Sequence, residues 1–505
     1  MLNPKESFLA LSLSNLFFIR VWQELIFAEP ANRFYLSTPL PVNYLAAILN
    51  VILLAAFFYL VLFLYRQYPA RFTPKLGAGM LLLLLLIPLN SLRLMFTSLT
   101  ITDLAATFGN YGLVMFSISL LALALTAAIR WHHFLTGSVT IILFILFPFV
   151  FFTFSQALWG AWRSEPPQAT VPPPSQAAVN FSASGEKHTT RVLWLVFDEL
   201  DQRLTFEEKP ASVETPELDR LRSKAIYATN AHPPADDTLH SMPALITGDP
   251  LARAEPAGAG ELQLTLEKTG ETLPWSKREN IFTRAEELGY NTGLVGCYLP
   301  YCRVIGDSLT TCYWQPFGSV ETNTREGLGK TMLNQFLSNF SISPFNQRRH
   351  AINVHLSLLE EAKIAAANPD LGLVLVHFSI PHYPWIYHRH RDSLTVFNYD
   401  MQYGYFDNLA LVDHTLRQLR LAMEDSATWE DTHLLISSDH PWRMELFPTF
   451  DGRRDSRVPF LLRFSGQQHS LSYSAPFNTI ISHDLILGLL ENRFSNADDL
   501  LNWLD

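Results

Sequence analysis

Cysteine is scarce in this chain of 505 residues, which contains only three. All three, Cys297, Cys302 and Cys312, lie within one stretch of sixteen residues. Their spacing and the lack of a fourth thiol argue against a zinc site made of cysteine alone. An oxidising compartment would allow one disulfide in this stretch and leave one thiol over, and the sequence leaves the pairing open.

An excess of basic residues is also missing. The chain has 37 Lys and Arg against 47 Asp and Glu, for a formal net charge of −10. This balance argues against nucleic acid as the main partner. Acids are almost absent up to about residue 160, so the negative charge belongs to the C-terminal part. We predict a transmembrane domain over 1–160, a linker rich in Pro, Ser and Ala over 161–190, and a globular domain over 191–505.

Long apolar runs fill the first part of the chain and are long enough to span a bilayer. Arg66, Arg71 and Lys75 follow the second run and Arg130 follows the fourth, whereas the other loops carry few cations. Since basic loops stay on the cytoplasmic side, we expect the large C-terminal domain on the outer side of the cytoplasmic membrane. The predicted spans are 8–27, which is interrupted by charged residues, 44–65, 77–95, 112–129 and 138–159.

From residue 191 onward, short apolar runs typical of buried strands alternate with helical patterns. This alternation predicts an α/β domain with a mostly parallel central sheet covered on both faces. Ligands bind such sheets beyond the carboxyl ends of the strands. The predicted strands are 191–197, 291–296, 371–378, 432–440 and 457–464, and the predicted helices are 215–225, 280–288, 347–367, 399–424 and 478–492.

Several polar side chains stand at the carboxyl ends of these strands. Asp198 and Glu199 follow the first strand, His377 ends a later one with His382 in the next loop, and Asp439 and His440 end a third. Oxygen and nitrogen ligands of this mix suit Zn²⁺, Mn²⁺ or similar ions. Each residue alone could cap a turn or stiffen a loop, but their joint placement favours an active site.

Thr238 begins a short apolar helix, TLHSMPALIT, after an acidic, helix-breaking segment. A side chain there faces unpaired backbone N–H groups and the positive end of the helix, which suits a phosphoryl or sulfuryl anion. Threonine alone is a poor nucleophile, so this interpretation requires a metal nearby. The alternative is that Thr238 is simply the N-cap of the helix.

These motifs resemble the alkaline phosphatase superfamily in its sulfatase-like branch. VFDEL, ending the first strand, resembles the family's opening metal-binding acid, and Ser438-Asp439-His440 resembles its later metal motif. Thr238, Ser241 and Pro243 match the Thr-x-x-Ser-x-Pro of membrane phosphoethanolamine transferases. Gly248, ten residues after Thr238, matches the end of the sulfatase signature. His382 in Pro-His-Tyr-Pro resembles the family's loop histidine.

The chain departs from the family pattern in three places. It lacks Cys-x-Pro-x-Arg, so the formylglycine of true sulfatases cannot form at Thr238. Pro441 replaces the glycine that follows the Asp-His pair. Arg457 stands where many relatives carry a histidine before their Val-Pro strand, which puts a second metal in doubt and favours a single ion. Arg457 could hold an anionic group of the substrate or be a surface arginine.

Spans followed by such a domain resemble the phosphoethanolamine transferases and lipoteichoic acid synthases. The resemblance implies that Thr238 takes a phospho-head-group from a membrane phospholipid and passes it to a glycan or glycolipid. A sulfatase-like or phosphodiester hydrolase, or a membrane factor with a degenerate site, remain alternatives. The resemblance gives Asp198, Thr238, Asp439 and His440, with Glu199, as ligands of one Zn²⁺ or Mn²⁺. His382 joins Thr238 as catalytic, and His377, Ser241 and Arg457 are expected to bind the substrate.

Overall fold

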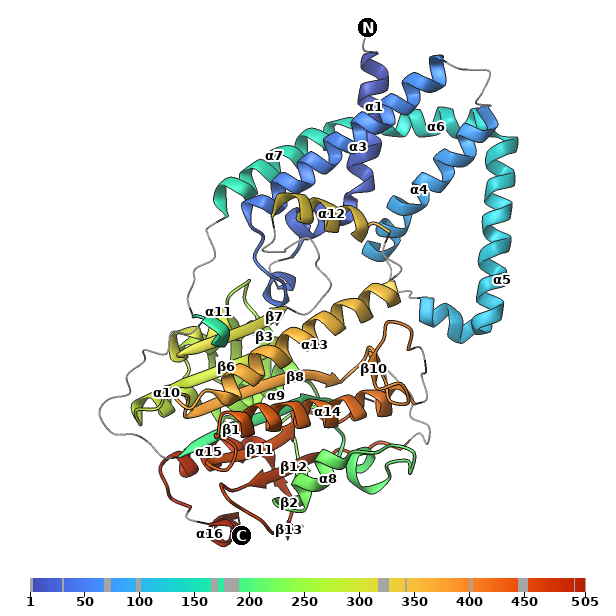
Figure 1. Cartoon of the computed structure of the whole chain (residues 1–505). Coiled ribbons are helices and arrows are strands. Elements are labelled where there is room, and N and C mark those ends of the chain that lie inside the picture. Colours follow the sequence, from blue (N-terminus) through green and yellow to red (C-terminus); the bar gives the residue numbers. More distant parts are fainter. Residues whose placement is uncertain are drawn as a thin grey trace. The chain divides into compact units, whose positions relative to one another are not determined.

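The computed structural model divides into two compact units (Figure 1). The helical unit comprises Met1–Glu29, Ser37–Gln168 and Val320–Ile342, and the α/β unit comprises Pro30–Leu36, Ala169–Ser319 and Ser343–Asp505. Neither unit is one continuous piece of sequence. The structure describes residues 3–29, 31–67, 74–96, 101–164, 171–176, 190–316, 327–340, 343–398, 400, 403–443, 453–494 and 496–504.

In the helical unit, one described helix, α3 (Pro41–Gln67), is long and apolar enough to cross a membrane, with a mean hydropathy of 2.7. The count rises to three if two bent helix pairs each form one span. The N-terminal apolar helices thus indicate membrane association, and the predicted set of five spans is not confirmed. The other helices are α1 (Pro4–Phe17), α2 (Ile19–Trp22), η1 (Gln23–Phe27), α4 (Pro74–Phe96), α5 (Ile101–Arg130), α6 (His132–Ile145), α7 (Phe147–Arg163) and α12 (Leu328–Ser338).

Two predicted spans are broken rather than continuous. The first bends by 61° between α1 and the segment Ile19–Phe27, which comprises α2 and η1. The last, predicted over 138–159, is divided at Leu146 between α6 and α7. Pro148 occupies the first turn of α7, where its missing N–H costs nothing, but it could not have continued the hydrogen bonds of α6. Hydropathy alone does not register such a break.

The α/β unit is built on a nine-stranded sheet in the order β13-β2-β12-β11-β1-β8-β6-β7, with β14 beside β2. Every pairing is parallel except those of β12. The prediction of a mostly parallel α/β domain is therefore confirmed. The strands are β1 (Arg191–Asp198), β2 (Ile226–His232), β6 (Thr292–Tyr298), β7 (Thr311–Pro316), β8 (Leu373–Pro381), β11 (Thr432–Ser438), β12 (Val458–Arg463), β13 (Leu471–Tyr473) and β14 (Phe477–Asn478).

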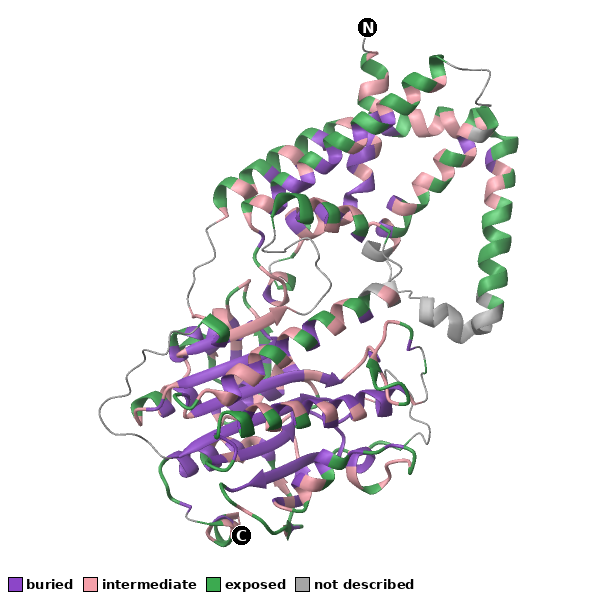
Figure 2. Cartoon of the chain, viewed as in Figure 1, coloured by how far each residue is buried: buried purple, intermediate pink, exposed green. Residues whose placement is uncertain are grey.

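Both faces of this sheet are covered. Val192 and Trp194 of β1 pack into one apolar cluster, and the alternate residues Leu193 and Leu195 pack into another. This is the two-residue period of a strand buried on both sides, and Figure 2 shows the central strands as buried. One face carries α9 (Thr238–Thr247), α10 (Ile281–Glu287) and α15 (Ser482–Leu490), and the other carries α8 (Pro216–Arg222), α13 (Ser343–Ala367) and α14 (Gly404–Asp425).

Local sequence explains where the helices of this unit begin and end. Asn280 and Thr283 form a capping box at the start of α10. Gly248 ends α9 with a φ of 75°, a left-handed conformation that glycine adopts without strain. A Cβ at Gly248 would lie 2.8 Å from Nδ1 of His483, so the close packing of α15 also requires glycine.

Smaller elements complete the unit. An antiparallel sheet contains β3 (Leu251–Pro256), β4 (Leu262–Leu266) and β5 (Thr272–Pro274), and β9 (Tyr387–His388) pairs with β10 (Ser393–Leu394). The short helix α11 (Tyr301–Val304) follows β6, and α16 (Ala497–Leu504) is the last element. Cys302 and Cys312 form a disulfide, and Cys297 is a buried free thiol, which resolves the pairing that the sequence left open.

Two segments outside 191–505 belong to the α/β unit. Residues 31–36 come from the loop that precedes α3, and the Phe34 side chain is fully buried in the core beside α11. The Arg303 guanidinium fixes this segment by donating to the carbonyl oxygens of Phe34 and Leu36. Most of the predicted linker lies outside the described residues, but the carbonyl oxygen of Pro172 accepts a 3.0 Å hydrogen bond from the N–H of Cys312.

Candidate active site

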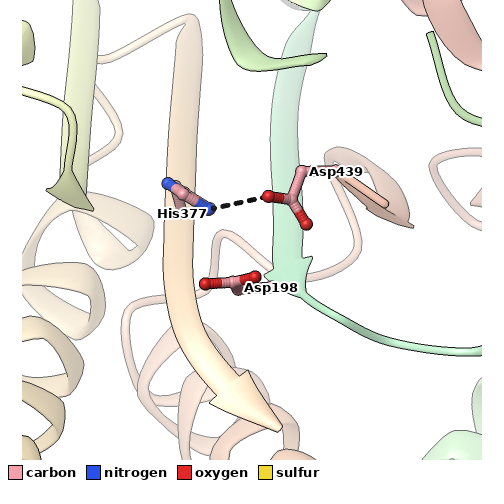
Figure 3. A group of neighbouring side chains, drawn as sticks. All are labelled: Asp198, His377 and Asp439. Atoms are coloured by element: carbon pink, nitrogen blue, oxygen red, sulfur yellow. Dashed lines mark ion pairs between the residues drawn. The ribbon is translucent and has the colours of Figure 1, made fainter. Parts of the chain in front are cut away.

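Three polar side chains meet at the carboxyl edge of the central strands. Asp198 is the last residue of β1, His377 lies in the adjacent β8, and Asp439 directly follows β11. One ligand atom from each of them lies within 4.8 Å of the others. Figure 3 shows the His377 imidazole pointing toward Asp439, at 3.9 Å from Nε2 to Oδ2. The edge selected by the strand-end rule is therefore where these groups converge.

The atoms that face one another here have no hydrogen-bond partner among the described residues. The buried atoms without a partner are Oδ1 of Asp198, Nε2 of His377, Oδ2 of Asp439 and Oε2 of Glu199. An unpaired buried polar atom is costly, and three carboxylates this close repel one another. The donor set of carboxylate oxygens and imidazole nitrogen therefore fits a divalent cation.

His440 completes this group. Its Nδ1 lies 3.0 Å from the carbonyl oxygen of Pro441, which can only accept, so Nδ1 carries a proton and Nε2 faces the carboxylates. Nε2 lies 3.4 Å from Oδ1 of Asp198 and 3.5 Å from Oδ2 of Asp439. Burial lowers the pKa of His440, but the two carboxylates outweigh it and the net shift is upward. Burial and the neighbouring acid Asp439 raise the pKa of Asp198 well above its usual value.

Thr238 is the first residue of α9, and its hydroxyl oxygen lies 3.3 Å from Nε2 of His440. The N-cap is Asp237, whose carboxylate accepts the backbone N–H of His240. The alternative interpretation of Thr238 as an N-cap is therefore wrong. Asp237 takes over that role, and the Thr238 hydroxyl is directed at the metal-binding group.

Arg443 links two further predicted residues, Glu199 and His382. Its Nε donates to Oε1 of Glu199 at 2.8 Å, and its Nη2 lies 3.2 Å from Nε2 of His382. The other ring nitrogen of His382 bonds to the carbonyl oxygen of Tyr383, which leaves Nε2 as the accepting nitrogen toward Arg443. This guanidinium, half-buried beside the carboxylates, was not predicted from the sequence. The nearest signal was its position three residues after His440.

Ser241 and Arg457 were predicted to bind substrate, but the structure gives both other partners. The Ser241 hydroxyl donates to the carbonyl oxygen of Ala235 at 3.0 Å and accepts its N–H at 3.1 Å, closing the loop before α9. Arg457 forms ion pairs with Asp455 and Glu207, which raise its pKa above the usual arginine value. The structure records no contact between the described metal-binding group and either side chain. The ion pairs favour the interpretation of Arg457 as a surface arginine.

Tyrosine side chains lie near the site, and no signal in the sequence predicted them. The Tyr301 hydroxyl lies 2.9 Å from Nδ1 of His377 and orients its ring. His377, which was predicted to contact the substrate, lies with Asp198 and Asp439 in a group that could hold a metal ion. Tyr298 ends β6 with a φ of 69°, a left-handed conformation uncommon for a tyrosine. Its ring packs 5.0 Å from the ring of Tyr35, which comes from the loop before α3.

The buried carboxylate–imidazole group and the Thr238 hydroxyl beside it lie in the part of the chain that a family model assigns to the alkaline phosphatase superfamily, in its sulfatase-like branch. The chain belongs to the sulfatase family, whose model matches residues 190–491. Members of this family use a divalent metal, and the buried Asp198, His377 and Asp439 could hold one.

Solved structures with a similar fold include three proteins at low identity. PsFucS1 sulfatase from Pseudoalteromonas sp. is 15% identical, with a TM-score of 0.43, 61% of this chain covered and 68% of that chain. Phosphonate monoester hydrolase of Agrobacterium radiobacter is 15% identical, with a TM-score of 0.41 and coverage of 60% and 74%. Murine ectonucleotide pyrophosphatase/phosphodiesterase 5 is 12% identical, with a TM-score of 0.35 and coverage of 60% and 95%. No curated protein matches the chain.

Proposed function

We propose that this chain is a membrane-anchored, metal-dependent phosphotransferase that uses Thr238 as its nucleophile. The observation that carries the proposal is the Thr238 hydroxyl, buried and 3.3 Å from Nε2 of His440, next to the unpaired atoms of Asp198, His377 and Asp439. A sulfatase that depends on formylglycine needs a cysteine or serine at this position. Threonine favours phosphoryl transfer over sulfate ester hydrolysis.

The residues of the site divide the work. A Zn²⁺ or Mn²⁺ ion held by Asp198, His377, Asp439 and His440 would stabilise the Thr238 alkoxide and the phosphoryl oxygens. In the first step the Thr238 hydroxyl oxygen bonds to the phosphorus of a membrane phospholipid, and the bond from that phosphorus to the diacylglycerol oxygen breaks. The Thr238 hydroxyl loses its proton, the departing diacylglycerol takes one up, and Thr238 keeps the phospho-head-group as a phosphodiester. The first N–H groups of α9 face the transferred anion, and the positive end of the helix favours its charge.

His382 and Arg443 serve the second step in this proposal. The Arg443 guanidinium can bind phosphoryl oxygens because it offers several donors in a fixed fork. Nε2 of His382 now faces Arg443 and can accept the proton of an acceptor hydroxyl once the guanidinium turns to the phosphoryl group. That hydroxyl, on a glycan or glycolipid, attacks the phosphothreonine and regenerates Thr238.

Anchoring in the membrane suits a lipid donor. Diacylglycerol lipids do not leave a bilayer readily, so holding the site at the membrane raises the effective concentration of donor. The basic loops after predicted spans two and four support an orientation with the α/β unit on the outer side of the cytoplasmic membrane. The donor is then a phospholipid of the outer leaflet and the acceptor a glycan or glycolipid of the cell envelope, with a phosphoethanolamine or phosphoglycerol group transferred.

Intact mass spectrometry of the full chain tests the proposal. We expect incubation with phosphatidylethanolamine or phosphatidylglycerol vesicles and Zn²⁺ or Mn²⁺ to add the mass of a phospho-head-group to the wild type and not to Thr238→Ala. Bound metal without an adduct, together with diacylglycerol release that needs no glycan acceptor, would indicate a hydrolase. If neither bound metal nor an adduct is detected, the result would favour a membrane factor with a degenerate site.

A further inference from the structure

Helix α12 (Leu328–Ser338) has an unexpected place in the structure. In sequence it lies between β7 and α13 of the α/β unit, yet it belongs to the helical unit and packs against α3. The sequence carries no apolar run there that predicts a membrane segment.

The face of α12 that meets α3 is polar. Thr331, Gln335 and Ser338 are buried, and they recur at the three- and four-residue spacing of one helix face. The Gln335 side chain donates to the carbonyl oxygen of Asn43 at 2.8 Å and accepts from the Asn50 amide at 3.2 Å. The same amide donates to the carbonyl oxygen of Met332 at 3.0 Å. Hydrogen bonds between helices of this kind hold helices together where the surroundings are apolar.

These contacts fix the position of α12 along α3. Asn43 and Asn50 lie in the N-terminal half of α3, so α12 covers roughly 10 Å of that half, at a rise of about 1.5 Å per residue. A second contact is aromatic, because the rings of Phe336 and Phe340 lie 5.9 and 5.6 Å from the ring of Phe17 in α1. The helix is therefore fixed within the helical unit at more than one point.

The opposite face of α12 is apolar and exposed. Leu333 and Leu337 are 54% and 41% exposed and lie four residues apart, on the side away from Gln335. A helix on the surface of a water-soluble protein shows the reverse arrangement, with its apolar stripe inside and its polar face outside. Helix α3 shows the same outward preference, since Leu49 and Leu53 are 37% and 60% exposed. Apolar side chains of both helices are thus left on the surface of one unit.

We infer that α12 is embedded in lipid, with Leu333 and Leu337 against the acyl chains beside the N-terminal half of α3. The polar face then pairs with α3, where unsatisfied polar groups would be most costly, and the apolar face meets hydrocarbon. Lys330, exposed in the first turn of α12, can extend its charge to the headgroup level along its apolar stem. This inference concerns the membrane surface and does not rest on the proposed reaction.

Spin-label accessibility in the full chain, reconstituted in phosphatidylcholine nanodiscs, tests this inference. The nitroxide is attached to Leu333→Cys or, in a second variant, Leu337→Cys, and its collisions with oxygen and with a water-soluble nickel chelate are compared. Oxygen concentrates in the acyl region and the chelate stays in water. Leu53→Cys on α3 provides the lipid reference, and Lys268→Cys in the exposed turn after β4 provides the water reference. Cys297 is a buried free thiol. The parent protein without an introduced cysteine, treated with the same label, measures any background from it.

We expect the labels at 333 and 337 to favour oxygen over the nickel chelate, as the label at 53 does. A preference for the chelate, as at 268, would show that this face of α12 lies in water and would overturn the inference. Low accessibility to both reagents would show that protein covers the face, which also overturns it. Two positions on the same face guard against one variant that fails to fold.

Discussion

The hydroxyl oxygen of Thr238 lies 3.3 Å from Nε2 of His440, although the two residues are separated by 202 positions in the chain. Thr238 is brought there by the first turn of α9, and His440 by the end of β11. His440 in turn lies within 3.5 Å of Asp198 and Asp439. A hydroxyl in this position can become a nucleophile if a cation lowers the cost of its alkoxide.

Replacing Thr238 should therefore abolish transfer. We expect Thr238→Ala to lower kcat for diacylglycerol release by about 10³-fold or more, as loss of a covalent nucleophile does in other enzymes. Thr238→Ser keeps a hydroxyl and should retain part of the activity. Thr247→Ser, at the far end of the same helix, is the matched control and should behave as wild type. Full activity of Thr238→Ala would remove the covalent mechanism.

Tyr301→Phe tests whether His377 holds a metal. The Tyr301 hydroxyl bonds to Nδ1 of His377, and removing such an orienting partner typically weakens metal affinity by about 10- to 100-fold. Calorimetric titration of the chelator-treated full chain with Zn²⁺ or Mn²⁺ measures the change in metal affinity. Tyr290→Phe removes a hydroxyl that bonds to the carbonyl oxygen of Leu490 and should leave metal affinity unchanged. Equal affinities in wild type and Tyr301→Phe would place the ion elsewhere.

Arg443 and Arg457 should differ in their effect on transfer. Arg443 contacts Glu199 and His382, whereas Arg457 is held by Asp455 and Glu207. We expect Arg443→Ala to lower kcat/KM by about 100-fold, because removing one partner of a buried charge pair costs about 2–5 kcal/mol. Arg457→Ala should change kcat/KM by less than about tenfold. The reverse order in steady-state kinetics would restore Arg457 as the group that binds the anionic substrate.

The buried carboxyl of Asp413 predicts a pH-dependent stability. Its Oδ1 accepts the N–H of Leu218 at the start of α8. Burial raises the pKa of Asp413 to about 6. A carboxyl whose folded pKa lies above its unfolded value destabilises the fold once it is ionised. This penalty is present above about pH 6 and disappears as the pH falls toward about 4.

Comparison of wild type with Asp413→Asn measures this contribution. The asparagine can still accept from Leu218 but cannot ionise, so the wild type should gain thermal stability relative to the variant as the pH falls from 7 to 4. The gain corresponds to at most about 3 kcal/mol in the free energy of unfolding. Asp425→Asn, at the exposed C-terminal end of α14, should show no such trend. A constant or opposite difference between wild type and Asp413→Asn would contradict the assignment.

The sequence by itself determined the sheet and the edge at which chemistry is expected. The apolar runs of β1, β8 and β11 are local patterns, and the residue that follows a buried strand must lie at its carboxyl end. Asp198, His377, Asp439 and His440 were identified on this basis. The start of α9 near Thr238 could also be predicted, because Pro233 and Pro234 interrupt any preceding helix and Asp237 is a favourable N-cap residue.

Only the tertiary structure decided which side chains complete the site and which do not. Arg443 lies in the segment after β11 and contacts Glu199 and His382. Arg457 forms ion pairs with Glu207 and Asp455 instead of contacting the metal-binding group. No local sequence pattern predicts these partners. The breaks in the predicted spans and the place of α12 beside α3 likewise depend on contacts between distant segments. Periodicity reports how one segment distributes its own apolar residues, whereas such partners are chosen by the packing of the whole chain.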